Sequence, residues 1–270
     1  MNIENELFSR TALLVGDEAM ARMSACSVII FGIGGVGSWV AESLVRSGIR
    51  RLTLVDSDCI DATNVNRQCP ATANTIGRVK VDAMKSRLLD INPKVEVETI
   101  QGVYSRETQA DYHLETYDYI IDAIDSLECK MDLILHATSL PLHVKFFSSM
   151  GAALKMDPTQ IRVDEFWKVK GCPLARALRQ KFKRAKQFPK RKFKVVYSPE
   201  VLENKGKNEE ETMTAMKGSQ GINKPIIDGK ATDWHQQKVH VNGTVAHTTA
   251  IFGFMLAGLV MQDICSVERD

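Results

Sequence analysis

The chain has 270 residues, of which 44% are hydrophobic and 25% are charged, and its formal net charge is +2. This is the make-up of an ordinary soluble globular protein, and the chain is long enough for one large domain or two small ones with a substantial core. The six cysteines include no Cys-x-x-Cys pair and the six histidines show no metal-ligand spacing, which disfavours a zinc ribbon, a redox couple and a chelated soft metal. No secretory signal is evident at the start, so we predict a cytoplasmic protein with reduced thiols.

Short β-rich runs alternate with stretches of helical spacing in the first half of the chain. Strands are predicted at Ser27–Phe31, Leu52–Asp56, Val95–Ile100, Tyr119–Asp122 and His143–Phe147. Helices are predicted between them at Val36–Ser47, Arg78–Asp90 and Leu127–Thr138. This alternation predicts an α/β class fold, a Rossmann-like, mostly parallel sheet with helices on both faces.

A glycine-rich turn follows the first predicted strand. The glycines of this turn are Gly32, Gly34, Gly35 and Gly37. Backbone amides point into one concavity at such a helix start, and the helix dipole favours negative charge there, so the turn predicts a phosphate-binding loop. Dehydrogenases and flavoproteins share this motif, so by itself it does not separate ATP from a dinucleotide.

Polar side chains follow two of the other predicted strands. Asp56 comes at the distance expected of a carboxylate that accepts hydrogen bonds from ribose hydroxyls. Asp122, Asp125 and Ser126 come at the end of the fourth predicted strand. Because ligands bind beyond the carboxyl ends of parallel strands, we expect these residues and the glycine turn to form one nucleotide site.

Two cations favour ATP over a dinucleotide as the ligand. Arg67 and Lys80 would add positive charge for the β- and γ-phosphates, whereas the helix amides already satisfy a pyrophosphate. Asp125 could then hold Mg²⁺. We therefore predict Arg67, Lys80 and Asp125 as catalytic residues. Each also has a structural reading, as a surface turn residue, a solvated first-turn lysine and a helix N-cap respectively.

A strongly basic segment interrupts a chain that is otherwise acidic. From Lys168 to Lys194 there are twelve lysines and arginines and no Asp or Glu. The segment is either a solvated helix and loop or a contact for a nucleic-acid backbone. Phe182, Phe188 and Phe193 lie in it and could pack beneath it or stack on bases. The candidate nucleic-acid contacts are Lys181, Lys183, Arg184, Lys186, Lys190, Arg191 and Lys192.

The last part of the chain is less regular. Residues 201–237 are polar and predict a mobile crossover loop that orders with a partner. Ala250–Met261 is a run of twelve apolar residues, whereas a membrane-spanning helix needs about 20, so a buried or dimer-interface helix is favoured over a membrane anchor. We predict one domain over residues 1–270. Its parts are a nucleotide-binding core at 1–165, the basic segment and crossover loop at 166–238, and a strand and helix at 239–270.

In their order, these motifs resemble those of the ThiF/MoeB superfamily of adenylating enzymes, which are related to ubiquitin-activating enzymes. The resemblance rests on Phe8-Ser9-Arg10, Gly32–Gly37, Arg46–Ile49, Thr63–Gln68, Gly77–Lys80 and Ile121–Ser126. Ser148–Ala152, Asp157–Thr159 and Val196–Glu200 are similar to the tRNA threonylcarbamoyladenosine dehydratases in particular. The match covers residues 8–200 and resumes weakly over 243–262.

The resemblance implies roles for individual residues. It implies a ubiquitin-activating-enzyme-like adenylation fold, a homodimer, and the use of ATP and Mg²⁺. Arg10 matches an arginine that relatives lend across the dimer, and Asp125 matches the magnesium ligand. Asp56 matches the ribose-binding acid. The residues that match phosphate contacts are Gly34, Gly35, Gly37, Asn64, Asn66, Arg67 and Lys80.

The substrate implied by the resemblance is tRNA that carries threonylcarbamoyladenosine next to the anticodon. Its threonyl carboxylate would be adenylated, and intramolecular ring closure would follow with release of AMP and pyrophosphate. An accessory sulfur-transfer or cysteine-desulfurase-type protein is a further implied partner, and stable DNA binding is not expected.

The chain departs from its sulfur-carrier-activating relatives in two ways. It lacks the paired Cys-x-x-Cys zinc site, and residues 201–237 contain no cysteine that could act as a second nucleophile. Chemistry that ends at intramolecular capture of the adenylate is therefore favoured. The alternatives are an adenylating enzyme for a sulfur-carrier or ubiquitin-like protein, a nicotinamide enzyme, and a nucleotide-gated binding protein without turnover.

Overall fold

The computed structural model describes residues 6–206 and 242–266, which form one seven-stranded sheet with the strand order β3-β2-β1-β4-β5-β7-β6. Neighbouring strands are parallel except for β6 and β7, which are antiparallel. The strands are β1 Ser27–Phe31, β2 Arg51–Val55, β3 Glu96–Ile100, β4 Tyr119–Asp122, β5 Lys145–Ser149, β6 Arg162–Glu165 and β7 Lys194–Tyr197.

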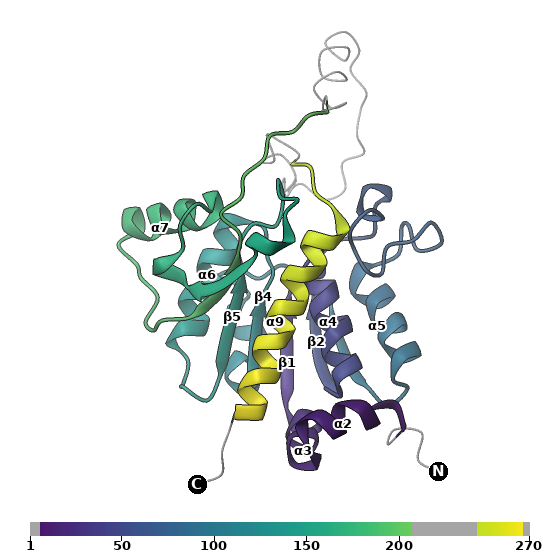
Figure 1. The fold of residues 1–270 in the computed structure, drawn as a ribbon. Coiled ribbons are helices and arrows are strands. Elements are labelled where there is room, and N and C mark those ends of the chain that lie inside the picture. The colour runs from purple at the N-terminus through teal and green to yellow at the C-terminus, as the bar shows by residue number, and fades with distance from the viewer. Residues whose placement is uncertain (1–5, 207–241, 267–270) are drawn as a thin grey trace.

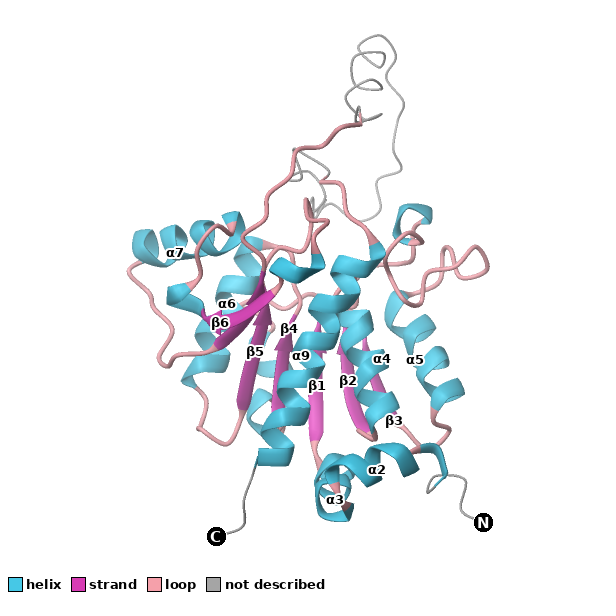
Figure 2. Ribbon diagram, viewed as in Figure 1, coloured by secondary structure: helices cyan, strands magenta, loops and turns pink. Residues whose placement is uncertain are grey.

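Helices cover both faces of this sheet (Figures 1 and 2). Side chains of a strand alternate between the two faces, so Ile30 of β1 packs with α4, α5 and α9 while its neighbour Phe31 packs in the core that includes α6 and α7. The predicted α/β architecture is confirmed. The helices are α2 Ser9–Val15, α3 Asp17–Ala25, α4 Gly37–Ser47, α5 Lys80–Ile91, α6 Leu127–Ser139, α7 Pro173–Ala185 and α9 Ala246–Ser266.

All five predicted strands and all three predicted helices are present, and no end is displaced by more than two residues. The predictions did not include β6 and β7. β6 has one apolar residue among three charged ones, and β7 begins at the end of a run of cations, so neither stands out as a β-rich segment. β7 begins at Lys194, the last residue of the basic segment, and pairs with β5 and β6.

The apolar C-terminal run lies within α9, which has 21 residues and is long and apolar enough to cross a membrane by length and composition alone. Half of its most apolar stretch is buried. α9 packs tightly on α4, because a Cβ on Gly253 would lie 2.7 Å from the Trp39 Cβ and from the Val36 carbonyl oxygen. α9 is therefore part of the helical layer that covers one face of the sheet.

Two predictions for the C-terminal third fall partly on residues that the structure does not describe. The crossover loop predicted at 201–237 lies outside the described residues from 207 onward. Of the strand predicted ahead of the last helix, residues 242–245 have no regular structure, and 239–241 lie outside the described residues.

Candidate nucleotide-binding site

The site lies where the direction of the chain through the sheet reverses. β1 lies between β2 and β4, so the successive connections run to opposite sides of it. In such sheets ligands bind in the crevice beyond the carboxyl ends at this point. Gly32 follows β1, Asp56 follows β2 and Asp122 ends β4, and Figure 2 shows these strand ends on one edge of the sheet.

The glycine turn is packed so closely that side chains are excluded from two of its positions. Gly32 has a φ of +86°, and a Cβ there would lie 2.7 Å from the carbonyl oxygen of Ala123. A Cβ on Gly37 would lie 1.8 Å from the carbonyl oxygen of Gly32. Ser38 then fixes the turn, because its Oγ donates to the Gly34 carbonyl at 2.6 Å. The turn therefore places bare backbone at the start of α4, as a phosphate loop requires.

Asp56 and Lys80 form a polar cluster beside this turn. The Ile33 amide donates to Asp56 Oδ2 at 2.7 Å, which ties the turn to the end of β2. Lys80 Nζ lies 3.1 Å from Asp56 Oδ1 and 2.9 Å from Asp58 Oδ2, and the Lys80 side chain is only 4% exposed. Lys80 thus neutralises two carboxylates next to the turn. Asp58 was not among the predicted site residues.

Arg67 lies against the glycine turn from the other side. The position of a Cβ on Gly35 would be 3.3 Å from Arg67 Cγ. Arg67 Nη1 donates to the Thr63 carbonyl and to Asn66 Oδ1, each at 2.8 Å. Burial lowers the pKa of Arg67 from its usual value, and the nearby carboxylate of Asp125 opposes this shift. The carboxylate of Asp125, which is exposed, is thus close enough to act on the charge of Arg67.

Two asparagines shape the segment that carries Arg67. Asn64 Oδ1 accepts from the Asp61 amide at 3.1 Å and closes a capping box around the turn Ala62–Asn64. Asn66 Nδ2 donates to the Thr244 carbonyl at 3.0 Å, which joins this segment to the chain just before α9. Both asparagines were predicted as phosphate contacts, and in the structure their side chains are engaged with the protein itself.

Asp122 lies beneath the site, not on its surface. Its side chain and that of Lys130 are both fully buried, with Lys130 Nζ 2.8 Å from Asp122 Oδ2. Ser148 Oγ donates to the same oxygen at 2.7 Å, and the Ile124 amide donates to Asp122 Oδ1 at 3.1 Å. Lys130 Nζ also donates to the Ile124 carbonyl at 2.9 Å. The prediction that Asp122 contacts the nucleotide is corrected here, because these bonds make it a clamp on the loop that carries Asp125.

Ser126 and Arg10 occupy different ends of the molecule. Ser126 is the N-cap residue of α6, and its side chain makes no capping hydrogen bond. Arg10 is exposed on α2, which Figure 1 shows at the edge of the sheet opposite to the glycine turn. Phe8, just before α2, lies 3.9 Å from the Cβ position of Gly48, at the far end of α4 from Gly37. The structure therefore does not bring Arg10 to the site of its own chain.

Several residues that line the site were missed by sequence reasoning. Thr249 Cγ2 would be 3.2 Å from a Cβ on Gly35, so the first turn of α9 covers the loop. Gln68 is buried beside Gly34, and Trp39 Nε1 donates to the Arg67 carbonyl at 3.0 Å. Gln68 directly follows Arg67 in the same motif, so the sequence could have indicated that Gln68 lies at the site. Nothing local in the sequence connects Thr249 to residues more than 180 positions away.

The basic segment divides into exposed and engaged cations. Lys181 forms an ion pair of 2.8 Å with Glu128, and its side chain is 30% exposed. Phe182 and Phe193 are buried, so they pack beneath the segment, whereas Phe188 is 48% exposed. Of the seven candidate nucleic-acid contacts, the exposed ones are Lys183, Arg184, Lys186, Lys190 and Lys192.

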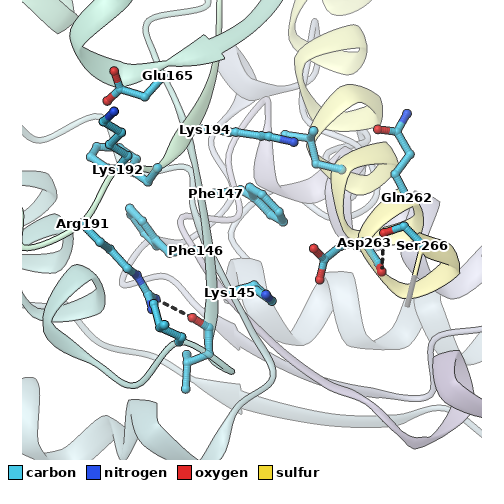
Figure 3. Close-up of a pocket in the computed structure, with 14 residues that line it drawn as sticks. Lys145, Phe146, Phe147, Glu165, Arg191, Lys192, Lys194, Gln262, Asp263 and Ser266 are labelled. Carbon is cyan, nitrogen blue, oxygen red and sulfur yellow. Dashed lines mark hydrogen bonds between the residues drawn. The ribbon is translucent and has the colours of Figure 1, made fainter. Parts of the chain in front are cut away.

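Arg191 has a structural role that corrects its prediction as a nucleic-acid contact. Its guanidinium donates to the carbonyls of Ala137, Leu140, Pro141 and Val144, at and just beyond the end of α6. Two of these carbonyls, those of Ala137 and Leu140, lie at the end of α6, where the last carbonyls have no partner within the helix. Figure 3 shows Arg191 with one of these bonds, beside a hollow of about 620 Å³ at the amino ends of β5 and β7. This hollow is at the opposite end of the strands from the glycine turn.

Within residues 6–206 and 242–266, no group of three or more His, Cys, Asp and Glu side chains could hold a metal ion. A divalent ion at this site would therefore need oxygen ligands from the nucleotide as well as from the protein. Mg²⁺ commonly binds in this way, through one or two carboxylates, substrate phosphates and water.

The fold and the site define a nucleotide-binding α/β protein with a cation and a carboxylate beside its phosphate loop. The ThiF family matches residues 8–270, so the chain belongs to the ThiF family. A tRNA threonylcarbamoyladenosine dehydratase of Bacillus subtilis (strain 168) is 40% identical over 193 residues, which cover 72% of this chain and 74% of the relative.

Solved structures of a similar protein contain adenine nucleotides. E. coli tRNA N6-threonylcarbamoyladenosine dehydratase, TcdA, in complex with AMP has a TM-score of 0.77 at 30% identity, and its complex with ATP has 0.78 at 29%. Each match covers 98% of this chain and 96% of TcdA. A molybdopterin-synthase adenylyltransferase of Haemophilus influenzae is 29% identical over only 57% of this chain. The similarity to dehydratases is thus both higher and longer.

Proposed function

We propose that the protein catalyses the ATP-dependent dehydration of threonylcarbamoyladenosine in tRNA, at the position next to the anticodon. The observation that carries the proposal is the meeting of the glycine turn, Arg67 and Asp125 at one edge of the sheet, in a ThiF-family chain that resembles dehydratases over most of its length. The predicted enzyme class, an ATP-dependent adenylating enzyme, follows from the same site.

In the first step the threonyl carboxylate of the tRNA attacks the α-phosphorus of ATP. A carboxylate O–P bond forms, the bond between the α-phosphorus and the bridging oxygen breaks, and pyrophosphate leaves with the electron pair. The backbone of the glycine turn binds the phosphates, and Arg67 stabilises charge on the transferring and leaving groups. Because Arg67 is already held by Thr63 and Asn66, little reorganisation is needed at the moment of reaction.

In the second step an atom of the neighbouring carbamoyl group attacks the acyl carbon of the adenylate. AMP leaves, one proton is released, and the nucleoside is one water lighter. Correct placement favours such an intramolecular closure without a strong external base. No thiol is needed for it, and burial raises the pKa of the nearby Cys69 thiol to about 12, so this thiol is not a nucleophile at neutral pH.

Asp125 is the residue that fits Mg²⁺. Its carboxylate is exposed, acts on the charge of Arg67 and comes from a loop that the buried Asp122–Lys130 pair holds in place. A single carboxylate together with phosphates and water is a suitable donor set for this hard ion. When bound, the ion would neutralise phosphate charge. We also propose that Lys80 contacts the phosphates and Asp56 the ribose. Bound ATP would then form hydrogen bonds to these two side chains in addition to the one that now joins them.

We also propose a homodimer in which Arg10 of each subunit serves the other subunit's site. α4 is about 16 Å long and separates Gly37 at the turn from Gly48 near Phe8, so Arg10 is at the wrong end of its own subunit. Leu13 and Leu14 on the same helix are 87% and 85% exposed, which suits a buried contact with a partner subunit.

The other predictions stay proposals of the same kind. The proposal of a single adenylating domain over residues 1–270 is supported by one continuous sheet, whose strands come from residues 27 to 197. Cytoplasmic location suits a tRNA-modifying enzyme. An accessory sulfur-transfer or cysteine-desulfurase-type partner and the absence of stable DNA binding also stay predictions.

The test is release of AMP and pyrophosphate from MgATP with threonylcarbamoylated tRNA and with the same tRNA unmodified. We expect one AMP for each nucleoside that becomes one water lighter by mass spectrometry, and turnover only with the modified tRNA. Turnover that is indifferent to tRNA would instead indicate an adenylating enzyme for a protein carboxyl terminus. Binding of ATP without any pyrophosphate release would indicate a nucleotide-gated binding protein.

A further inference from the structure

Two exposed aromatic rings lie next to each other in the part of the chain that the reaction leaves without a role. Trp167 is 38% exposed and Phe188 is 48% exposed, with ring centroids 6.3 Å apart and planes tilted by 42°. They come from separate segments, one following β6 and the other following α7. Two adjoining exposed rings form a small apolar surface on an otherwise basic segment, which makes it a candidate contact surface.

The rings rest on a rigid base. Trp167 packs edge-on against the buried Phe166 at 5.2 Å and lies 6.4 Å from the buried Phe182. Phe166 stacks in turn on Phe193, with the planes 16° apart. The Arg179 guanidinium lies 5.7 Å from the Phe166 centroid and donates to the Phe166 carbonyl. Trp167 is therefore held in place before any ligand arrives, which lowers the entropic cost of binding.

Exposed cations frame these rings. Lys168 follows Trp167 directly, and Lys186 and Lys190 flank Phe188 two residues away on either side. The main-chain amide of Trp167 donates to Glu165 Oε1, so this acidic side chain is engaged in capping the turn. Aromatic faces surrounded by cations are how proteins contact unpaired nucleotides, through stacking on bases and attraction of phosphates.

We propose that Trp167 and Phe188 form a stacking platform for unpaired nucleotides of the substrate tRNA, with Lys168, Lys186 and Lys190 contacting its phosphates. The inference rests on the proposed function and specifies which part of the surface recognises the tRNA. A second copy of the chain is disfavoured as the occupant. A two-fold interface places the same patch of each subunit together, and this patch would oppose lysines to lysines.

The experiment measures the affinity of the full-length protein for threonylcarbamoylated tRNA over a series of salt concentrations. Trp167→Leu and Phe188→Leu remove the aromatic face and keep an apolar side chain, while Trp167→Phe keeps a ring and is the matched control. We expect each leucine variant to weaken binding by roughly tenfold, with an unchanged slope of log affinity against log salt, because stacking is not ionic. Trp167→Phe should bind within about twofold of the wild type, as expected if any aromatic face suffices.

A charge variant separates the two parts of the platform. Lys186→Gln with Lys190→Gln should weaken binding and lower the salt slope by about one for each phosphate that is no longer neutralised. Trp167→Leu could fail to fold because Trp167 packs against the core. In that case the affinity of Phe188→Leu, whose substitution lies on an exposed loop, tests the platform by itself. Unchanged affinity in the leucine variants would overturn the inference. So would an equal loss of affinity in Trp167→Phe and Trp167→Leu, since packing and not the ring would then matter.

The two proposals fail in distinguishable ways. If the wild type dehydrates modified tRNA but both leucine variants bind it normally, the platform is wrong and the function stands. If the wild type releases no AMP with modified tRNA, the proposed function itself is wrong. Stronger binding of the wild type to anionic lipid vesicles than to tRNA would also overturn the platform.

Discussion

Arg67 and Lys80 carry the same charge beside the glycine turn, but the fold depends on them differently. Arg67 is half-buried and donates to one carbonyl and one amide oxygen. Lys80 is nearly inaccessible and compensates two carboxylates. Removing a buried partner of this kind costs about 3–5 kcal/mol because a charge is left uncompensated. A substitution of Arg67 therefore tests the contribution of the charge to catalysis with less effect on folding than a substitution of Lys80.

We predict that Arg67→Ala lowers the rate of pyrophosphate release with modified tRNA by roughly a hundredfold or more, because the transition state no longer meets a preorganised positive charge. The free energy of unfolding should change by no more than about 1 kcal/mol, the scale of one or two exposed hydrogen bonds. Arg67→Lys is the control, since it keeps the charge and removes the planar fork. Full activity of Arg67→Ala would remove this residue from the proposed mechanism.

The buried Asp122–Lys130 pair allows a second test at this scale. Lys130→Met leaves the fully buried Asp122 without its cation and should destabilise the protein by about 3–5 kcal/mol in urea unfolding. The double variant Asp122→Asn with Lys130→Met has no uncompensated charge, so it should recover much of that stability.

If the pair positions Asp125, the stable double variant should still need more Mg²⁺ for half-maximal turnover than the wild type. The loop from Asp122 to Asp125 would lose the ion pair beneath it and the bond from Lys130 to the Ile124 carbonyl, while an amide oxygen at position 122 could still accept from the Ile124 amide. A Mg²⁺ requirement equal to that of the wild type would limit the pair to a purely structural role.

The helices are held in place partly by polar contacts between them. Glu42 of α4 is 4% exposed and accepts from Arg87 of α5 at 2.8 and 3.1 Å and from Arg46 at 2.8 Å. Burial alone would raise the pKa of Glu42, but the bonds from the two arginines outweigh it and hold the pKa below its usual value of 4.5. α4 starts at the glycine turn, so this contact also braces the nucleotide site.

A pH dependence follows from that lowered pKa. The unfolded chain takes up the proton of Glu42 at a higher pH than the folded one, so the stabilisation is complete above about pH 4.5 and disappears as the pH falls through the folded value. Glu42→Gln should lower the unfolding free energy at pH 7, and its difference from the wild type should shrink below pH 4.5. Chemical unfolding at several pH values measures this. A difference that stays constant with pH would contradict it.

At the scale of the whole molecule, one apolar surface stands out. Phe254 on the outer side of α9 is 46% exposed and packs edge-on against Trp39 at 5.8 Å. Ile251, Met255 and Met261 are only partly buried on the same helix. A helix of this composition at a protein surface suits a subunit interface, as does the exposed leucine pair on α2.

We predict that Phe254→Glu dissociates the proposed homodimer, because a buried carboxylate without a partner opposes association. Sedimentation velocity should show a dimer for the wild type and a monomer for the variant, and AMP release should fall because Arg10 is withdrawn from the partner's site. Phe254→Leu is the matched control and should stay dimeric. A wild type that is monomeric at all concentrations would contradict both the interface and the role given to Arg10.

The sequence by itself determined the order of strands and helices up to β5 and the residue types at the phosphate loop. Alternation, helical spacing and glycine requirements are local properties, which is why Ser27–Phe31 and Tyr119–Asp122 were predicted to the residue. The glycine turn and Arg67 likewise follow from short motifs. The strand β6 was missed because it has one apolar residue among three charged ones, and β7 was missed because it begins at the end of a run of cations.

Only the tertiary structure decided what each charged side chain faces. Asp122 and Arg191 were predicted as ligand contacts from residue type and position, but the fold buries Asp122 against Lys130 and turns Arg191 onto the end of α6. It also brings Thr249 onto Gly35 and Trp167 beside Phe188. These relations join residues far apart in the chain, and packing, not local pattern, determines whether a charge is used within the protein or left for a ligand.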